Sequence, residues 1–198
     1  ARRGFVVLLT LLTLLATPLP SRCPAAAADT GRTVSGVTMP ETVEVDGHML
    51  SLNGMALRKK FVVKVYVAGL YLASTSSRPE DIIGADAPRQ MVLHFISGHG
   101  TKKKMCEAWN DGLEANTNGA TPELKKQFAD LCEMMTDIKD GEAMLLTYVP
   151  GTGTRIDIAA AERGTIPGKD FADAILRCWI GPKPGPGEGF KKNLLGQS

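Results

Sequence analysis

The sequence lacks the short motifs by which several common enzyme classes are recognised. It contains no HExxH, CxxC, Walker A or GxSxG pattern, so nothing in it indicates a zinc protease, a thiol redox enzyme, a P-loop nucleotidase or an α/β-hydrolase. The only three histidines are scattered, and no two have metal-ligand spacing on one element: His48, His94 and His99. We therefore expect neither a metal site nor a cofactor.

An excess of charge is also missing. The chain has 23 basic and 21 acidic residues in 198, a formal net charge of +2. The first 28 residues hold three arginines and no acid, so the remainder has 20 basic against 21 acidic residues, or −1. A nucleic-acid binder would show a basic excess or stripe. The short runs Lys102–Lys104 and Lys191–Lys192 fit solvated helix faces, and we expect no nucleic-acid partner.

The N-terminal segment has the organisation of a signal peptide. Arg2-Arg3 supply a positive start, Phe5–Leu15 form an apolar stretch, and Ala26–Ala28 fit the small-residue rule for cleavage. The apolar stretch is too short for a good transmembrane helix. The sequence predicts a signal peptide over 1–28, a single domain over 29–198, and a periplasmic or secreted protein with no stable membrane anchor after cleavage. The export route, Sec or twin-arginine, stays open.

The rest of the chain alternates between strand-like and helix-like segments, without internal repeats. Asn53-Gly54 and Thr165–Gly168 have turn composition, and the segment before Pro40 is a polar lead-in. We expect strands at Thr42–Val45, Met49–Leu52, Phe61–Leu72, Gln90–Ile96, Met144–Val149 and Thr154–Ala159, and helices at Pro79–Ile83, Thr101–Asn116, Pro122–Met135, Phe171–Ile180 and Lys191–Leu195. This segregation predicts an α+β fold with an antiparallel sheet and helices packed on one face.

One pair of residues suggests an anion site. Arg58 stands at the mouth of the expected central strand, and Tyr66 follows eight residues on. If the extended run begins near Arg58, a period of two puts Lys60, Lys64 and Tyr66 on one face. An arginine gives two parallel donors to a carboxylate or phenolate, and a tyrosine adds a third. The alternative is that Arg58 is a rim residue and Tyr66 a core residue.

Two blocks of sequence resemble a known family. Asn53–Phe61 running into Lys64–Leu72, and Ile166–Phe171 followed by Ile175–Gly181, are similar to the leading block and closing helix of the chalcone isomerase-like family. The resemblance covers essentially the whole chain after residue 28. It implies a curved antiparallel sheet, an open-faced sandwich with helices over one face, and an apolar cleft between the layers. Plant members close a flavanone ring, and other members bind fatty acids or have no known catalysis.

When the resemblance is carried over residue by residue, most of the catalytic residues of the plant isomerases have no match in this sequence. Arg58 matches the family's arginine, but Tyr66 stands where a strand threonine is usual and Cys178 where a threonine or serine is usual. Asn110 is only an approximate match to the family's asparagine, and the expected helix around it offers no tyrosine. The candidate ligand-binding residues are thus Arg58, Tyr66, Asn110 and Cys178, with Arg58 and Tyr66 as the only catalytic candidates.

Three functions remain open from the sequence. The first is a non-catalytic binder of a small apolar anion such as a fatty acid, with Arg58 at the head group and Trp109 and Trp179 along the tail if they face inward. The second is an isomerase or intramolecular lyase acting on an unknown substrate. The third is a structural envelope protein whose cleft is vestigial.

Cys106 and Cys132 form a candidate disulfide. If their helices make an antiparallel hairpin that turns near Gly119, each cysteine lies 13 residues from the turn, at the same height. An exported protein meets an oxidising compartment, which favours a bridge. Two buried free thiols are the equally open alternative, and Cys178 stays unpaired in either case.

Overall fold

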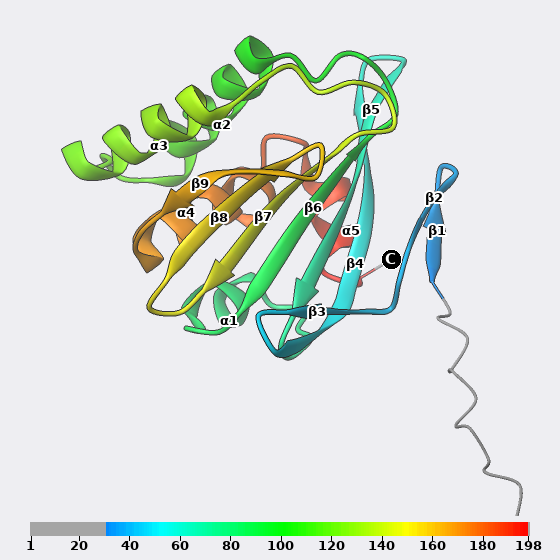
Figure 1. Ribbon diagram of the computed structural model, residues 1–198, viewed down its shortest axis with the longest axis horizontal. Helices are drawn as coiled ribbons and strands as arrows, with labels where there is room; N and C mark the ends of the chain where they lie inside the picture. The colour runs from blue at the N-terminus through cyan, green and yellow to red at the C-terminus, as the bar shows by residue number, and fades with distance from the viewer. Residues whose placement is uncertain (1–30, 198) are drawn as a thin grey trace, which may run out of the picture.

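A curled seven-stranded antiparallel sheet organises the computed structural model, which describes residues 31–197 (Figure 1). Each strand pairs with the next one along the chain, so the sheet is a meander. Its members are β3 (Thr42–Val45), β4 (His48–Lys60), β5 (Val63–Leu72), β6 (Arg89–Phe95), β7 (Ala143–Val149), β8 (Gly153–Ile158) and β9 (Ala161–Ile166). The expected signal peptide lies outside the described residues.

The helices cover one face of this sheet, as the sequence predicted (Figure 1). They are α1 (Pro79–Gly84), α2 (Lys102–Asn116), α3 (Pro122–Met134), α4 (Lys169–Ile180) and α5 (Glu188–Leu194). The helix α4 is the most buried of them, with Phe171, Ile175 and Trp179 each at most 3% exposed. Burial of such apolar side chains supplies the main stabilisation of the helix layer. The fold is therefore α+β, as expected, and no helix among residues 31–197 has the length and apolarity needed to cross a membrane.

The other face of the sheet is partly covered by a small hairpin. The strands β1 (Arg32–Val34) and β2 (Val37–Met39) pair with each other and lie beside β4 (Figure 1). Met39 packs against Gly69 of β5, and Pro40 accepts a hydrogen bond from the Tyr71 hydroxyl at 2.9 Å. The lead-in that the sequence left without structure is thus ordered, because it buries apolar side chains of β4 and β5 that helices do not reach.

The prediction of a central strand over Phe61–Leu72 is wrong at its start, because β5 begins at Val63. Phe61 and Val62 form the tight turn between β4 and β5, with Phe61 at φ 54°, and both side chains are more than 90% exposed. Their apolar, β-forming character predicted a strand. The turn forms in spite of this preference because it allows β4 and β5 to pair along most of their length on either side of it.

The expected turn at Asn53-Gly54 is also wrong, because β4 runs straight through it. The side chain of Asn53 donates from Nδ2 to the Leu194 carbonyl at 2.8 Å and accepts from the Ser76 backbone amide at 2.9 Å. Gly54 marks a register shift and lets the backbone of α5 approach β4 closely. Asn-Gly is here a bulge and packing site, a role that glycine in a strand often has.

A third correction concerns the edge of the sheet. Residues 165–168 were expected to be a turn, but Thr165 and Ile166 belong to β9 and pair with β8. This strand was missed because its exposed residues Glu162 and Arg163 are charged and its Gly164 has a positive φ. Charged residues and irregularity are typical of an edge strand that must not pair with another chain.

Candidate functional site

The register of the β4–β5 hairpin brings Arg58 and Tyr66 together as directly opposite residues. They meet across two strands and not along one extended run, so the expectation of a single face from Arg58 onward is corrected. Arg58 is half-buried, and its Nη1 donates to the carbonyl of Lys59 at 3.2 Å and to that of Pro186 at 3.3 Å. No carboxylate of residues 31–197 forms an ion pair with it. Its positive charge is therefore uncompensated within that part of the chain.

Tyr66 lies just inside Arg58, in an aromatic cluster. Its ring is 5.4 Å from that of Phe95 and 6.2 Å from that of Phe190, centroid to centroid, and its hydroxyl oxygen accepts from Trp179 Nε1 at 3.1 Å. Burial raises the pKa of Tyr66 to about 12, although the Trp179 hydrogen bond and the Arg58 charge act in the opposite direction. The phenol thus keeps its proton at any physiological pH, and no acceptor for that proton is present among residues 31–197.

The other two candidates from the sequence have different surroundings. Asn110 is exposed on α2, so the structure does not bring its side chain to Arg58. Cys178 is buried on α4, and its thiol donates to the carbonyls of Trp109 at 3.8 Å and Ala174 at 3.7 Å. Burial raises the pKa of this thiol to about 12, which disfavours the nucleophilic thiolate form. A Cβ on Gly112 would lie 2.7 Å from its sulfur, which shows that Cys178 sits in the α2–α4 contact.

Cys106 of α2 and Cys132 of α3 are joined in a disulfide, with their Cα atoms 5.6 Å apart. We expect one free thiol, Cys178, when the protein spanning residues 29–198 is unfolded without reductant and titrated with a thiol reagent. On the chain-entropy model a bridge across 26 residues stabilises by about 3 kcal/mol, so reduction should also lower the melting temperature. Three free thiols would rule the bridge out, and the C106S/C132S double variant is the matched control for the effect of reduction.

A small cavity lies between the sheet and α4. Its volume is about 20 Å³. Most of its lining is apolar and comes from Leu70, Met91, Leu146, Ile175, Leu176 and Trp179, while Arg89, Tyr148 and Thr154 are the polar exceptions. Because Trp179 lines this cavity and also donates to Tyr66, the cavity begins one indole ring away from the Arg58–Tyr66 pair.

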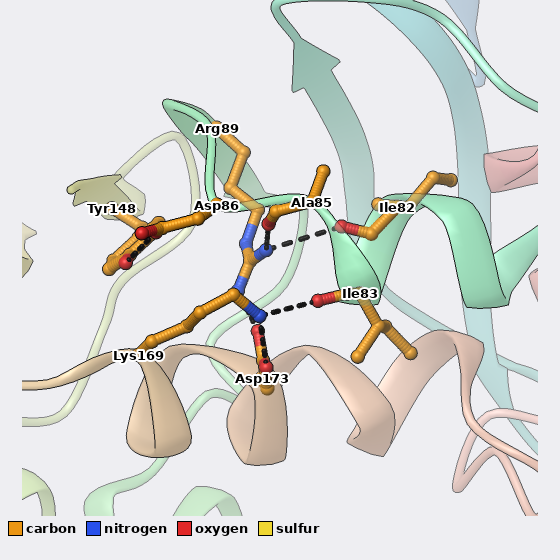
Figure 2. A network of polar contacts seen from close by, with 8 residues as sticks. All are labelled: Ile82, Ile83, Ala85, Asp86, Arg89, Tyr148, Lys169 and Asp173. Atoms are coloured by element: carbon orange, nitrogen blue, oxygen red, sulfur yellow. Dashed lines mark hydrogen bonds and ion pairs between the residues drawn. The ribbon is translucent and has the colours of Figure 1, made fainter.

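A second polar network is centred on Arg89, a residue to which no sequence motif points (Figure 2). Arg89 is 5% exposed and donates from Nη2 to Asp173 Oδ1 at 2.6 Å and from Nη1 to the carbonyls of Ile82 and Ala85. Its guanidinium lies 4.8 Å from the centroid of the Tyr148 ring. The network ties α1 and β6 to β7 and α4.

Two further groups complete this Arg89 network. Lys169 donates from Nζ to the Ile83 carbonyl at 2.7 Å and to the second oxygen of Asp173. The Tyr148 hydroxyl donates to Asp86 Oδ1 at 2.6 Å, and burial together with the Asp86 carboxylate raises the pKa of Tyr148 to about 12. The network thus contains two cations, both paired with Asp173, and two carboxylates, so it is formally neutral. Only the i,i+4 spacing of Lys169 and Asp173 was visible in the sequence, and it did not point to Arg89.

A larger hollow opens at the surface on the other side of Arg89. Its volume is about 340 Å³, and its walls are residues 72–76, 81–82, 85 and 87–89. Arg89 lines both the hollow and the internal cavity. Within residues 31–197 no cluster of three or more histidine, cysteine, aspartate or glutamate side chains is arranged to hold a metal ion.

Comparisons with known proteins identify what the chain is similar to. A family model described as chalcone isomerase-like matches residues 31–196. Among solved structures, the crystal structure of a fatty-acid binding protein from Arabidopsis thaliana superposes with a TM-score of 0.64 over 81% of this chain and 92% of that chain, at 19% sequence identity. A likeness at this identity establishes the fold. No curated protein sequence matches the chain.

Proposed function

The chain belongs to the chalcone isomerase-like family, and from this premise we propose that it is an exported, non-catalytic binder of a small apolar anion such as a fatty acid. The observation that carries the proposal is the pairing of Arg58, a half-buried cation with no carboxylate partner among the described residues, with the protonated phenol of Tyr66. A cation that is partly withdrawn from water forms stronger hydrogen bonds with an anion than with neutral acceptors. A bound carboxylate would supply that anion.

The contacts of Arg58 suggest how the head group binds. In the structure its Nη1 is shared between two carbonyl oxygens at 3.2 and 3.3 Å. These are neutral acceptors at the long end of the hydrogen-bond range. A carboxylate would replace them with shorter, charge-assisted bonds, and Tyr66 would donate its uncommitted proton to the same anion.

The tail would extend between the sheet and α4. Trp179 connects the Arg58–Tyr66 pair to the apolar cavity described above. A cavity of about 20 Å³ holds no more than a water, so an acyl chain must separate α4 from β5–β7 to enter. The connector between α4 and α5, whose Pro186 carbonyl holds Arg58, is released in the same step.

A non-catalytic role is proposed because most of the hydrogen-bond donors that an isomerase of this family would need do not meet at Arg58. Ring closure in the plant relatives uses several hydroxyl donors, and here Asn110 is exposed while Cys178 is used in helix packing. Loss of a single oriented donor typically lowers the rate by about 10²–10³. Export is supported by the signal-like residues 1–28 and by the Cys106–Cys132 pair, since disulfides persist in oxidising compartments.

One observation favours a second function. The rings of Phe95, Phe190 and Trp179 surround Tyr66, and neither the internal cavity nor the surface hollow is lined by Arg58 or Tyr66. A cleft filled by its own side chains is what a structural envelope protein with a vestigial cleft would have. Binding measurements separate the two functions.

We expect the protein to bind saturated fatty acids and R58A to bind them about ten- to a hundredfold more weakly, because a hydrogen bond to a charged group contributes about 1.5–3 kcal/mol. Isothermal titration calorimetry on residues 29–198 measures this. The matched control is R163A, which removes an exposed arginine of β9 that forms no ion pair within residues 31–197 and should bind like the wild type. No affinity for any fatty acid, with no lipid seen by native mass spectrometry of protein from its own host, would favour the vestigial cleft.

A further inference from the structure

An unsatisfied hydroxyl group lies in the wall of the internal cavity. Thr154 of β8 is 2% exposed, and its Oγ1 has no hydrogen-bond partner among the described residues. Burial of a hydroxyl without a partner costs about 1–3 kcal/mol, so native proteins rarely keep one. A buried polar atom that faces a cavity and lacks a partner indicates that something else occupies the cavity when the protein works.

The proposed tail site is a strip of the helix-facing side of the sheet that starts at the Arg58–Tyr66 pair, and we call it the binding strip. The register of the sheet places Thr154 at the end of this strip that is remote from Arg58. Leu72, Arg89, Tyr148 and Thr154 are successive cross-strand partners on β5, β6, β7 and β8. Tyr66 lies six residues before Leu72 on β5, on the same face, which is about 20 Å along the strand at about 3.3 Å per residue. Thr154 lies three strands further across the sheet, which adds about 14 Å sideways at about 4.8 Å per strand. The residues of β5 between them on that face, Ala68 and Leu70, are apolar and fully buried. The strip is thus polar at both ends and apolar in the middle.

From this arrangement we propose that the ligand is bipolar: an apolar acid that carries an uncharged hydroxyl or carbonyl group at the end remote from its carboxylate, where Thr154 Oγ1 binds it. This inference rests on the proposed function and specifies its ligand class. The Thr154 hydroxyl both donates and accepts, so a ligand hydroxyl matches it in either direction.

The charges around Thr154 indicate that the ligand group bound there is uncharged. Arg89 and Lys169 are both paired with Asp173, and Asp86, which accepts from the Tyr148 hydroxyl, brings the formal charge of the network to zero. A second carboxylate would therefore be buried without a counter-ion, at a large desolvation cost. A dicarboxylic acid should bind worse than either a simple fatty acid or a hydroxy acid.

A single ordered water is the rival occupant, because a cavity of about 20 Å³ has room for one. The two occupants differ in their consequences. A water bound in the resting protein satisfies Thr154 without conferring any preference among ligands. A ligand hydroxyl that replaces it contributes to affinity, and only for ligands that carry it.

The test compares hexadecanoic acid, its ω-hydroxy derivative and hexadecanedioic acid on wild type, T154V and T154S by calorimetry. We expect wild type to bind the hydroxy acid about five- to tenfold more tightly than hexadecanoic acid, the value of roughly one net hydrogen bond. T154V should lose this preference, and T154S, which keeps the hydroxyl, should retain it. R58A should weaken both acids by the same factor.

Each outcome decides the matter. Equal affinity of wild type for the two monoacids, or a preference that survives in T154V, overturns the bipolar ligand while leaving the fatty-acid binder in place. Absence of binding to all three acids overturns both. T154V should also be no less stable to thermal unfolding than wild type, since the hydroxyl it removes has no partner in the described structure. A clear loss of stability together with equal affinity for the two monoacids would show that an ordered water, and not a ligand hydroxyl, is the partner of Thr154, and would overturn the proposal.

Discussion

Removal of the Asp173 carboxylate is expected to lower the free energy of unfolding by about 3–5 kcal/mol. Asp173 is the common acceptor for Arg89 and Lys169, and the side chain of Arg89 is only 6% exposed. The D173A variant leaves this guanidinium buried without its carboxylate, and a buried unpaired charge is among the most destabilising changes known for a single residue. Urea denaturation followed by circular dichroism measures the loss.

The chain supplies a matched control for burial. Lys126 and Asp130 of α3 form an ion pair with the same separation of 2.6 Å as Arg89 and Asp173, but they are 68% and 42% exposed. D130A should therefore change stability by less than about 1 kcal/mol. In the double variant R89M/D173L, apolar side chains replace the most buried pair, and we expect much of the lost stability to return. Lys169 also loses Asp173 in this variant, but its side chain is 28% exposed and keeps the hydrogen bond to the Ile83 carbonyl. If D173A and D130A were equally mild, the Arg89 network would not be holding α1 and α4 to the sheet.

Substitution of Gly54 by alanine is expected to destabilise the protein by about 3 kcal/mol and to detach α5. A Cβ at this position would lie 2.2 Å from the carbonyl oxygen of Asn193 and 2.4 Å from that of Leu194. Both are backbone atoms, so the helix as a whole must move, and overpacking of this kind usually costs about 1–3 kcal/mol. The Asn53–Leu194 hydrogen bond lies at the same contact and should be lost as well.

The control for Gly54 comes from α5 itself. Gly189 is exposed near the start of α5, and a Cβ there would meet nothing within 4 Å. G189A should be neutral or slightly stabilising, because alanine favours the helix and restricts the unfolded chain. Thermal unfolding of both variants, with hydrogen exchange of the α5 amides as the local readout, measures the difference. An unchanged melting temperature in G54A would contradict the close contact between β4 and α5.

The candidate site was predictable in part. The pairing of Arg58 with Tyr66 was suggested by spacing and by the family resemblance, although the structure achieves it across a hairpin and not along one strand. Thr154 had no signal in the sequence, and the only signal for the Arg89 network was the i,i+4 spacing of Lys169 and Asp173. Their partners come from elements separated by tens of residues, and nothing in the chain order says that Asp173 meets Arg89.

By itself the sequence determined the features that depend on neighbouring residues. Thr101 and Thr121 cap the helices that their position predicted, the apolar stripe of α4 faces the sheet, and the order of strands and helices fixes the α+β class. Only the tertiary structure decided the rest. Asn53-Gly54 became a bulge under α5, Phe61-Val62 became a turn, and Arg89 became a buried ion pair. Local preferences amount to about 1 kcal/mol per residue or less, and the pairing of long strands and the desolvation of a charge outweigh them.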